Sequence, residues 1–355
     1  MHDFLIVGGG IAGLSAAARL SELGRVLLLE AEPAFGYHAS GRSAALYEPR
    51  YGLPPVVELS LAGEAHFRDT GVLSPRGMMI VAGADEADLF RREAALMRLD
   101  DIGAEAARQM VPVLNDRVAF AAHATHAWDI DTDRLMQDFR RAAQSRGAEF
   151  HTGAPVTAIA RDAQGWQVTT ATGRFAARML VNAAGAWADR VAALAGVRPV
   201  GLQPLRRSMA RIAAPGGHDV SRWPMLFGAG ETWYAKPDAG ALIVSPAEEH
   251  PLDPQDAWAD DMVLAEGLAR YEAMVTEPVT RPLATWAGLR TFAPDRVLVI
   301  GPDPQEPSFV WLAGQGGYGF QTSDGASRLL ADLIAGRSPQ FDPAVVAALA
   351  PARFG

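Results

Sequence analysis

The chain has 355 residues, of which 49% are hydrophobic and 21% are charged, and its formal net charge is -9. This length predicts about two domains, and the composition is that of a folded globular protein. The negative charge argues against nucleic acid or an anionic membrane surface as the main partner. The absence of cysteine excludes disulfides, thiolate catalysis and a cysteinyl bond to a cofactor.

The N-terminus carries no basic segment, and Gly8 interrupts its apolar run far too early for a signal peptide. No apolar run elsewhere approaches the ~20 residues that a membrane-spanning helix needs. We therefore expect a cytoplasmic protein with no transmembrane segment.

Residues 1–30 follow the pattern of a strand, a glycine turn, a helix and a second strand. The apolar run Phe4–Val7 precedes the turn Gly8–Gly13, and the alanine-rich segment Leu14–Leu23 has apolar residues at helical spacing. A second apolar run, Val26–Leu29, ends at Glu30. This order predicts a βαβ unit, and its glycines match the dinucleotide fingerprint G-x-G-x-x-G.

Each glycine of the fingerprint has a physical task. Gly8 permits a tight turn, Gly10 lets the backbone approach a pyrophosphate, and Gly13 lets the helix pack closely on the strand. Phosphates are stabilised by the free N–H groups at a helix N-terminus, and Glu30 can accept hydrogen bonds from ribose hydroxyls. The residues expected to hold the nucleotide here are Gly8, Gly10, Ile11, Ala12, Gly13, Glu30 and Ala31.

A second glycine-rich loop, Gly314–Gly319, lies near the C-terminus. It follows apolar runs at Val297–Ile300 and Phe309–Ala313 and precedes a predicted helix at Thr322–Ile334. The positive end of that helix suits the pyrimidine edge of a flavin, where negative charge appears on reduction. These features favour FAD over NAD, and an NAD-dependent dehydrogenase is the alternative.

The middle of the chain is mixed. Short alternating segments from 149 to 180 predict a β-meander, and residues 206–245 are strand-rich. Ala84–Leu99 and Thr132–Arg146 are predicted surface helices. We divide the chain into a discontinuous nucleotide-binding domain, residues 1–46, 130–200 and 291–355, and a substrate-binding domain, residues 47–129 and 201–290.

Four further motifs stand out along the chain. They are GYHASGRSAA at 36–45, VNAAGAW at 181–187, TWAGLR at 285–290 and QGGYGFQTS at 315–323. Their order and spacing resemble those of the glycine oxidase/D-amino acid oxidase superfamily of FAD flavoproteins, over nearly the whole chain. Within that superfamily they are most similar to bacterial D-arginine dehydrogenases.

The resemblance implies an α/β fold in which a Rossmann-type FAD-binding domain is interleaved with an α+β substrate domain. A mixed β-sheet of the substrate domain would cover the flavin. It further implies oxidation of the Cα–N bond of a D-amino acid to an imine, which water hydrolyses to a 2-oxo acid and ammonia. Without cysteine we expect FAD to bind non-covalently, with a histidyl bond left open, and we expect no metal site.

The resemblance also extends the FAD site beyond the N-terminal unit. His38 either contacts FAD or only packs beside it. The remaining expected contacts come from the four motifs and from the meander. With His38 they are Ser40, Gly41, Arg42, Ser43, Ala44, Val156, Ala184, Gly185, Trp187, Gly314, Gly316, Gly317, Tyr318, Gly319, Phe320 and Gln321.

An amino acid substrate needs its carboxylate fixed, and arginine offers a planar, bidentate donor. The resemblance assigns this task to Arg290 and, as a second contact, to Arg207, with a structural ion pair as the alternative for both. Tyr234 and Tyr51 match tyrosines that line the pocket, and core packing is their alternative. Gly317 is expected to present its carbonyl to the substrate amine, because glycine has no Cβ.

The sequence departs from the D-arginine enzymes at two positions. Met78 stands where the family has an acid that pairs with the substrate guanidinium, and Leu46 replaces a histidine. An unpaired buried cation costs several kcal/mol, so these residues predict a neutral, hydrophobic D-amino acid. Glu48 is expected to be a solvated loop acid; turned inward, it would restore a preference for basic substrates.

Three alternatives stay open beside this prediction. One is a sarcosine, glycine or 2-hydroxy acid oxidase of the same fold, since all of these need the carboxylate clamp. Another is the NAD enzyme, and the third is a non-catalytic flavin-binding subunit of a larger complex. The electron acceptor is equally open between oxygen, a quinone and a dye, because no motif encodes it.

Overall fold

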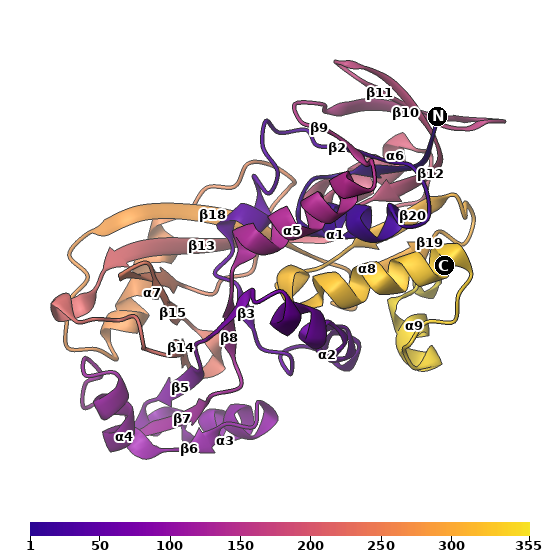
Figure 1. Cartoon of the computed structure of the whole chain (residues 1–355). Coiled ribbons are helices and arrows are strands. Elements are labelled where there is room, and N and C mark those ends of the chain that lie inside the picture. Colours follow the sequence, from indigo (N-terminus) through magenta and orange to yellow (C-terminus); the bar gives the residue numbers. More distant parts are fainter.

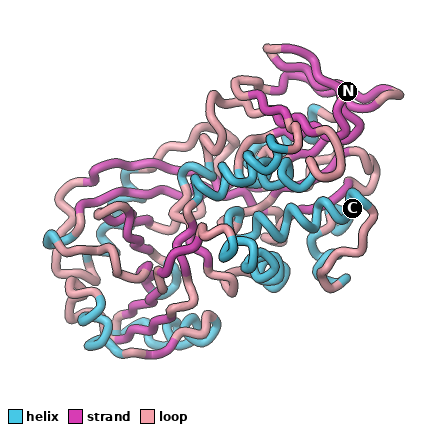
Figure 2. The backbone as a smooth tube through the Cα atoms, in the orientation of Figure 1, coloured by secondary structure: helices cyan, strands magenta, loops and turns pink.

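The computed structural model describes residues 1–355 and contains two large β-sheets and one small sheet. The two large sheets lie towards opposite ends of the molecule (Figure 1). Several helices lie side by side next to the first sheet, and the strands of the second sheet lie in the other half of the molecule (Figure 2). The predicted α/β class, with mixed sheets, is confirmed.

The first sheet is built around the predicted βαβ unit. Strand β1 (His2–Val7) lies between β2 (Val26–Leu29) and β12 (Gly173–Asn182), and both neighbours run parallel to it. The helix of the unit, α1, spans Ile11–Leu20, so it begins within the predicted glycine turn, includes Gly13, and starts earlier than the predicted Leu14. The other strands are β9 (Glu149–His151), β10 (Val156–Asp162), β11 (Gly165–Thr170), β19 (Val299–Pro302) and β20 (Phe309–Ala313).

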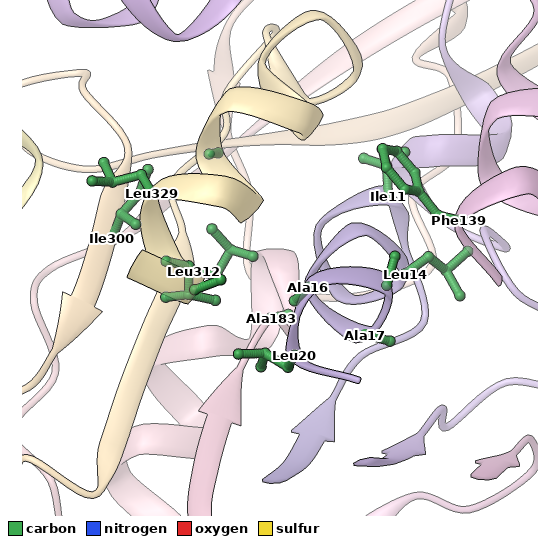
Figure 3. Close-up of a cluster of buried hydrophobic side chains, with 14 of the residues drawn as sticks. Ile11, Leu14, Ala16, Ala17, Leu20, Phe139, Ala183, Ile300, Leu312 and Leu329 are labelled. Atoms are coloured by element: carbon green, nitrogen blue, oxygen red, sulfur yellow. The ribbon is translucent and has the colours of Figure 1, made fainter. Parts of the chain in front are cut away.

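Helix α1 is almost entirely buried between this sheet and two other helices. Its Ala16 and Ala17 are fully buried and, being small, let the neighbouring backbones approach. Leu14 and Leu20 pack against residues of β19, β20, α5 (Thr132–Ser145) and α8 (Gly319–Ala335) (Figure 3). Full burial of one such leucine contributes about 1.5–3 kcal/mol, so this cluster fixes the turn that precedes α1.

The second sheet has nine strands, and one of its faces forms a separate apolar core. Met79, Val81, Leu226 and Val244 point to this face and are fully or almost fully buried. Helices α4 (Gly103–Met110) and α7 (Asp261–Glu272) cover it. The strands are β5 (Met78–Ala82), β6 (Asp100–Asp101), β7 (Phe120–Ala124), β13 (Gln203–Ala213), β14 (Met225–Gly228), β15 (Tyr234–Asp238), β16 (Ala241–Ser245), β17 (His250–Pro251) and β18 (Pro282–Phe292).

The remaining elements are one small sheet and four α-helices. The small sheet consists of β3 (Leu46–Tyr47), β8 (Trp128–Ile130) and β4 (Leu73–Pro75). Helix α2 (Pro54–Asp69) packs against α8 although it falls in the predicted substrate-binding segment, and the division into domains stays a prediction. No helix has the length and apolar character needed to cross a bilayer. The other helices are α3 (Ala87–Leu96), α6 (Ala188–Leu194) and α9 (Pro343–Leu349).

Asp324 is a buried charge that links α1 to α8. Its side chain is inaccessible to solvent, and its two carboxylate oxygens pair with Arg19 of α1 and Arg328 of α8. The distance from Nη2 of Arg328 to Oδ2 of Asp324 is 2.7 Å. Removal of one member of a buried network leaves the other charges uncompensated, so Asp324 holds the two helices in register.

We predict that Asp324→Ala lowers the free energy of unfolding by about 1.5–3 kcal/mol, because the partly exposed guanidinium groups of Arg19 and Arg328 lose their charged hydrogen-bond partner between the two helices. The measurement is urea denaturation followed by circular dichroism. Asp332→Ala is the matched control on the same helix, since Asp332 forms only a long contact of 3.9 Å with Arg337. The control is expected to cost less than about 1 kcal/mol, and equal losses in both variants would contradict the assignment.

Candidate active site

The main cavity, of about 520 Å³, lies between the first sheet and one face of the second. Gly8, Glu30 and Ala183 line it, and each directly follows the carboxyl end of one of three adjacent parallel strands, β1, β2 and β12. In open α/β sheets ligands bind at this edge, because the loops that leave the strands open there.

The glycine turn after β1 has the geometry that a dinucleotide requires. Gly8 has φ +111°, and a Cβ there would lie 2.4 Å from the carbonyl oxygen of Ala183. A Cβ at Gly13 would lie 1.8 Å from the carbonyl oxygen of Gly8, so only glycine allows helix and turn to meet. Gly10 begins α1 without any side-chain cap. The helix N-terminus therefore opens to the cavity and fits a pyrophosphate.

Glu30 occupies the position predicted for the ribose contact. Its Oε1 accepts the N–H of Glu32 at 2.8 Å, and its Oε2 accepts the N–H of Gly9. These bonds hold the carboxylate at the cavity wall, where its remaining lone pairs can accept ribose hydroxyls. Ser40 accepts the N–H of Ile11 at 3.0 Å, so one donor of the α1 terminus is already satisfied by the protein.

Arg42 joins the nucleotide-binding loop to the second sheet. It ends the short 3-10 helix η1 (Ala39–Arg42) and donates to the carbonyls of Ala287 at 2.9 Å and Ala257 at 3.1 Å. Its Nη2 also pairs with Asp256 at 2.6 Å. The guanidinium is thus bound mainly by protein groups and clamps η1 against β18.

His38 lines the cavity and is held from two sides. Its Nε2 lies 2.9 Å from Oε1 of Glu32, and its ring centroid lies 4.6 Å from that of Trp187. His38 therefore packs on Trp187 at the border of the space expected to hold FAD, and a contact with FAD stays a prediction.

Most predicted cofactor residues lie at the cavity wall. Gly13, Gly41, Ala44, Gly314 and Tyr318 do not: the glycines shape turns behind the wall, Ala44 is buried in an apolar cluster, and Tyr318 faces a second cavity. Sequence reasoning missed several wall residues that belong to no fingerprint. The predicted residues found at the wall are Gly8, Gly10, Ile11, Ala12, Glu30, Ala31, His38, Ser40, Arg42, Ser43, Val156, Ala184, Gly185, Trp187, Gly316, Gly317, Gly319, Phe320 and Gln321, and those missed include Gly36, Tyr37, Arg190, Gln255 and Ala257.

The two predicted clamp arginines lie on one face of the second sheet because of the register of β13 and β18. Arg207 is opposite Gly288, and Leu205 is opposite Arg290, so the arginines are diagonal neighbours on the same face. Gly288 leaves the space that η1 fills, since a Cβ there would touch Ala39 and Arg42. The sheet thus brings both guanidinium groups to the cavity.

Arg290 has no protein partner for its charge. Its guanidinium lines both cavities and forms no hydrogen bond or ion pair with any other group of the chain. A Cβ at Gly317 would lie 3.0 Å from Nη1 of Arg290, so glycine at 317 makes room for this side chain. Burial lowers the pKa of Arg290, but Tyr234, Tyr51 and the carboxylates of Glu231 and Glu249 together outweigh this effect, and the guanidinium stays charged.

Arg207 is buried and held in place. Its Nε donates to the carbonyl of Glu248 at 2.9 Å, and its Nη2 lies 3.4 Å from Oε1 of Glu249. Burial and the neighbouring charge of Arg290 lower the pKa of Arg207. A ligand carboxylate between the two arginines would relieve their repulsion.

A second, polar cavity of about 420 Å³ shares Arg207, Arg290 and Gly317 with the main one. Tyr51 lines it and donates its hydroxyl to Glu231 at 2.9 Å. Burial, together with the charge of Glu231, raises the pKa of Tyr51, which therefore stays protonated at neutral pH.

Three of the five non-glycine residues with positive φ line this second cavity. They are Glu231 (φ 50°), Ala247 (φ 56°) and Arg296 (φ 63°). Backbone strain of this kind costs about 1–3 kcal/mol per residue and clusters at functional sites. The second cavity is therefore part of the site.

Apolar residues occupy the same sheet face as the arginines. Tyr234, Met209 and Ile243 form one buried cluster there, and the hydroxyl of Tyr234 has no partner in the chain. Leu46 borders this cluster and lines the main cavity. Met78 is inaccessible to solvent and lies in a neighbouring core cluster, so the prediction that it forms the pocket wall is wrong; it supports Leu46 from behind.

Glu48 is the clearest correction to the sequence analysis. The sequence predicts a solvated loop acid, yet Glu48 is only 3% exposed. It lines neither cavity, and its Oε2 lies 3.0 Å from Nε2 of His126. No local signal marks His126 as the partner, because the two residues are distant in sequence and meet only through the fold.

Comparison with known proteins agrees with this geometry. The profile of the family described as "DAO: FAD dependent oxidoreductase" matches residues 3–333. Glycine oxidase of Pseudomonas aeruginosa is 28% identical over 96% of this chain and 96% of its own length. Human dimethylglycine dehydrogenase is 25% identical over 99% of this chain but only 44% of its own. The structure of glycine oxidase from Geobacillus kaustophilus superposes with a TM-score of 0.84 at 24% identity, covering 97% of both chains. The chain belongs to the DAO family of FAD-dependent oxidoreductases.

Proposed function

We propose that this protein oxidises a neutral, hydrophobic D-amino acid to the corresponding imino acid, which water then converts to a 2-oxo acid and ammonia. The observation that carries the proposal is the unpaired guanidinium of Arg290 at the junction of the two cavities. A guanidinium that forms no hydrogen bond or ion pair with the chain is open to an anionic ligand, and a substrate carboxylate fits it.

The carboxylate binds between Arg290 and Arg207, which approach it from diagonal positions on β18 and β13. Tyr51 stays protonated at the edge of this space, and its one hydroxyl hydrogen is donated to Glu231, so it borders the ligand and leaves charge pairing to the arginines. The hydroxyl of Tyr234 also lacks a partner, but it is buried behind the cavity wall, and Tyr234 lines neither cavity. The two arginines fix the substrate so that its Cα–H faces the side of the cavity where the flavin is expected.

FAD supplies the acceptor for the two electrons and the proton that leave Cα as hydride. As the Cα–H bond breaks, the nitrogen lone pair forms the C=N bond, so the amine must arrive deprotonated. No histidine adjoins the clamp arginines in either cavity, and the protein's contribution is orientation and exclusion of water. Water then hydrolyses the imino acid to the 2-oxo acid and ammonia.

A neutral side chain suits the wall beside the clamp. Leu46 and Met209 line the cavity there, and Ile243 and Phe227 pack behind them. A cationic side chain would be buried against this wall without a partner, because Glu48 is engaged by His126. The preference for the D-enantiomer is supported by the resemblance of the motifs, and an amino acid substrate is supported by the relation to glycine oxidase.

We predict that Arg290→Met lowers kcat/KM at least about 30-fold, because loss of one partner of a buried charge pair costs about 2–5 kcal/mol. Stopped-flow flavin reduction gives the rate and the apparent Kd. Arg211→Met is the matched control in the same sheet, since Arg211 pairs with Asp238 at 2.8 Å away from the cavities. Equal kinetics in Arg290→Met and in the control would remove the clamp from the proposal.

The substrate class is tested by anaerobic bleaching of the flavin with a panel of compounds. D-leucine, D-methionine and D-phenylalanine are expected to bleach it faster than D-arginine, because the wall at Leu46 is apolar. Faster bleaching by D-arginine would overturn the preference for neutral side chains. Bleaching only by glycine, sarcosine, L-amino acids or 2-hydroxy acids would replace the proposed substrate with that class.

A further inference from the structure

The segment from Glu48 to Tyr51 is a tight turn that carries a cavity residue. The N–H of Tyr51 donates to the carbonyl of Glu48 at 3.0 Å, and the N–H of Arg50 donates to Oε1 of Glu48 at 2.9 Å. Oε1 of Glu48 therefore stabilises the turn through a hydrogen bond inside the turn itself. The turn presents Tyr51 to the second cavity, where its hydroxyl bonds to Glu231.

Gln321 holds both ends of this turn to helix α8. Its Oε1 accepts the N–H of Glu48 at 3.4 Å, and its Nε2 donates to the carbonyl of Tyr51 at 3.2 Å. Gln321 lies in the first turn of α8 and lines the main cavity. The turn is thus connected to the wall expected to face the flavin.

His126 holds the other side of the turn to the second sheet. It lies between β7 and β8, and its Nε2 is 3.0 Å from Oε2 of Glu48. The side chain of Glu48 is 4% exposed and that of His126 is 29% exposed. Neither Oε2 of Glu48 nor Nε2 of His126 forms a well-aligned hydrogen bond with any group of the chain, so their mutual contact at 3.0 Å is the polar contact open to both atoms. Two such atoms this close need a proton between them, since two lone pairs would repel.

We propose that Glu48 and His126 form a positioning pair that holds the turn carrying Tyr51 over the substrate site. The inference extends the proposed function, because it names residues that act on the substrate site without touching the substrate. Glu48 links the turn to α8 through Gln321 and to the second sheet through His126. Loss of His126 removes the second link, so the turn loosens while the arginine clamp stays in place.

Several charged groups surround the pair. Arg50 of the turn lies near both members, and Arg98 and Asp100 lie near His126. Burial raises the pKa of Glu48 to about 7, and burial lowers the pKa of His126. At neutral pH His126 is therefore uncharged and can donate Nε2–H to the carboxyl of Glu48.

The buried carboxyl predicts a pH dependence of stability. Because its folded-state pKa is raised, the stability that Glu48 contributes is present below its unfolded pKa and is lost as pH rises through about 7. We expect Tm to fall less between about pH 4.5 and pH 7.5 in Glu48→Gln, which cannot ionise, than in the wild-type holoenzyme, because the loss occurs between the unfolded and folded pKa values of Glu48. Glu149→Gln is the control, because the Glu149 side chain is 50% exposed in its pair with His2. If Tm changes with pH in the same way in Glu48→Gln and in the wild type, the proposed ionisation of a buried Glu48 is wrong.

The proposal is tested by hydrogen–deuterium exchange of a peptide spanning residues 46–53 in the FAD-loaded enzyme. His126→Ala should exchange this peptide at least about three times faster than wild type, because the turn opens locally. His126→Gln should restore slow exchange, since its amide can donate to Glu48. His2→Ala removes a comparable histidine–carboxylate contact of 3.1 Å elsewhere and should leave the peptide unchanged. Unchanged exchange in His126→Ala would overturn the proposal, whatever the substrate proves to be.

Kinetics provide the functional measurement. With the amino acid that reduces the flavin fastest, His126→Ala should raise KM about fivefold or more and leave kcat within about twofold, because positioning of the turn affects binding. An unchanged KM despite faster exchange would overturn the link between the turn and the site. If no amino acid reduces the wild-type flavin, the proposed function fails, while the exchange measurement still decides whether the pair holds the turn.

Discussion

The site depends on the contact at which η1 meets β18. Arg42 reaches across this contact and donates to Ala257 and Ala287, and Gly288 keeps the strand free of a side chain where η1 lies. Because these groups are fixed, the face of the second sheet that carries Arg207 and Arg290 lies against the carboxyl end of the first sheet. Neither sheet alone encloses the cavity.

The arrangement concentrates positive charge in a small volume. Two helices, α1 and α8, begin at the main cavity without side-chain caps, and Arg207 and Arg290 lie on the facing sheet. Each helix start carries about half a positive charge. The protein therefore holds a site that is electrostatically unfavourable when empty and is suited to an anionic nucleotide and an anionic substrate. The strained backbone around the second cavity adds to this cost.

Sequence alone predicted what is encoded locally. The spacing of Gly8, Gly10 and Gly13 fixes a turn and a helix start within a few residues, so the βαβ unit could be read directly. The resemblance named Arg290, which the fold brings to both cavities, and its role as a carboxylate clamp stays a prediction. Burial of Glu48 could not be predicted, because it follows from a partner, His126, that the fold brings close. The sequence pattern also could not show that Leu46 lines the cavity while Met78 of β5 is buried behind it, because this depends on how the strands pack in three dimensions.

The register of β13 and β18 has a consequence for how such a protein can change. The clamp arginines are fixed by the pairing of β13 with β18 in the second sheet, whereas Leu46 of the apolar wall comes from β3 in the small sheet. Substitutions at Leu46 change the shape of the cavity wall that faces the substrate side chain. They do not disturb the hydrogen bonds between β13 and β18 that position Arg290. Different structural elements thus bind the substrate carboxylate and contact the substrate side chain. The side-chain preference can therefore change while binding of the carboxylate stays constant.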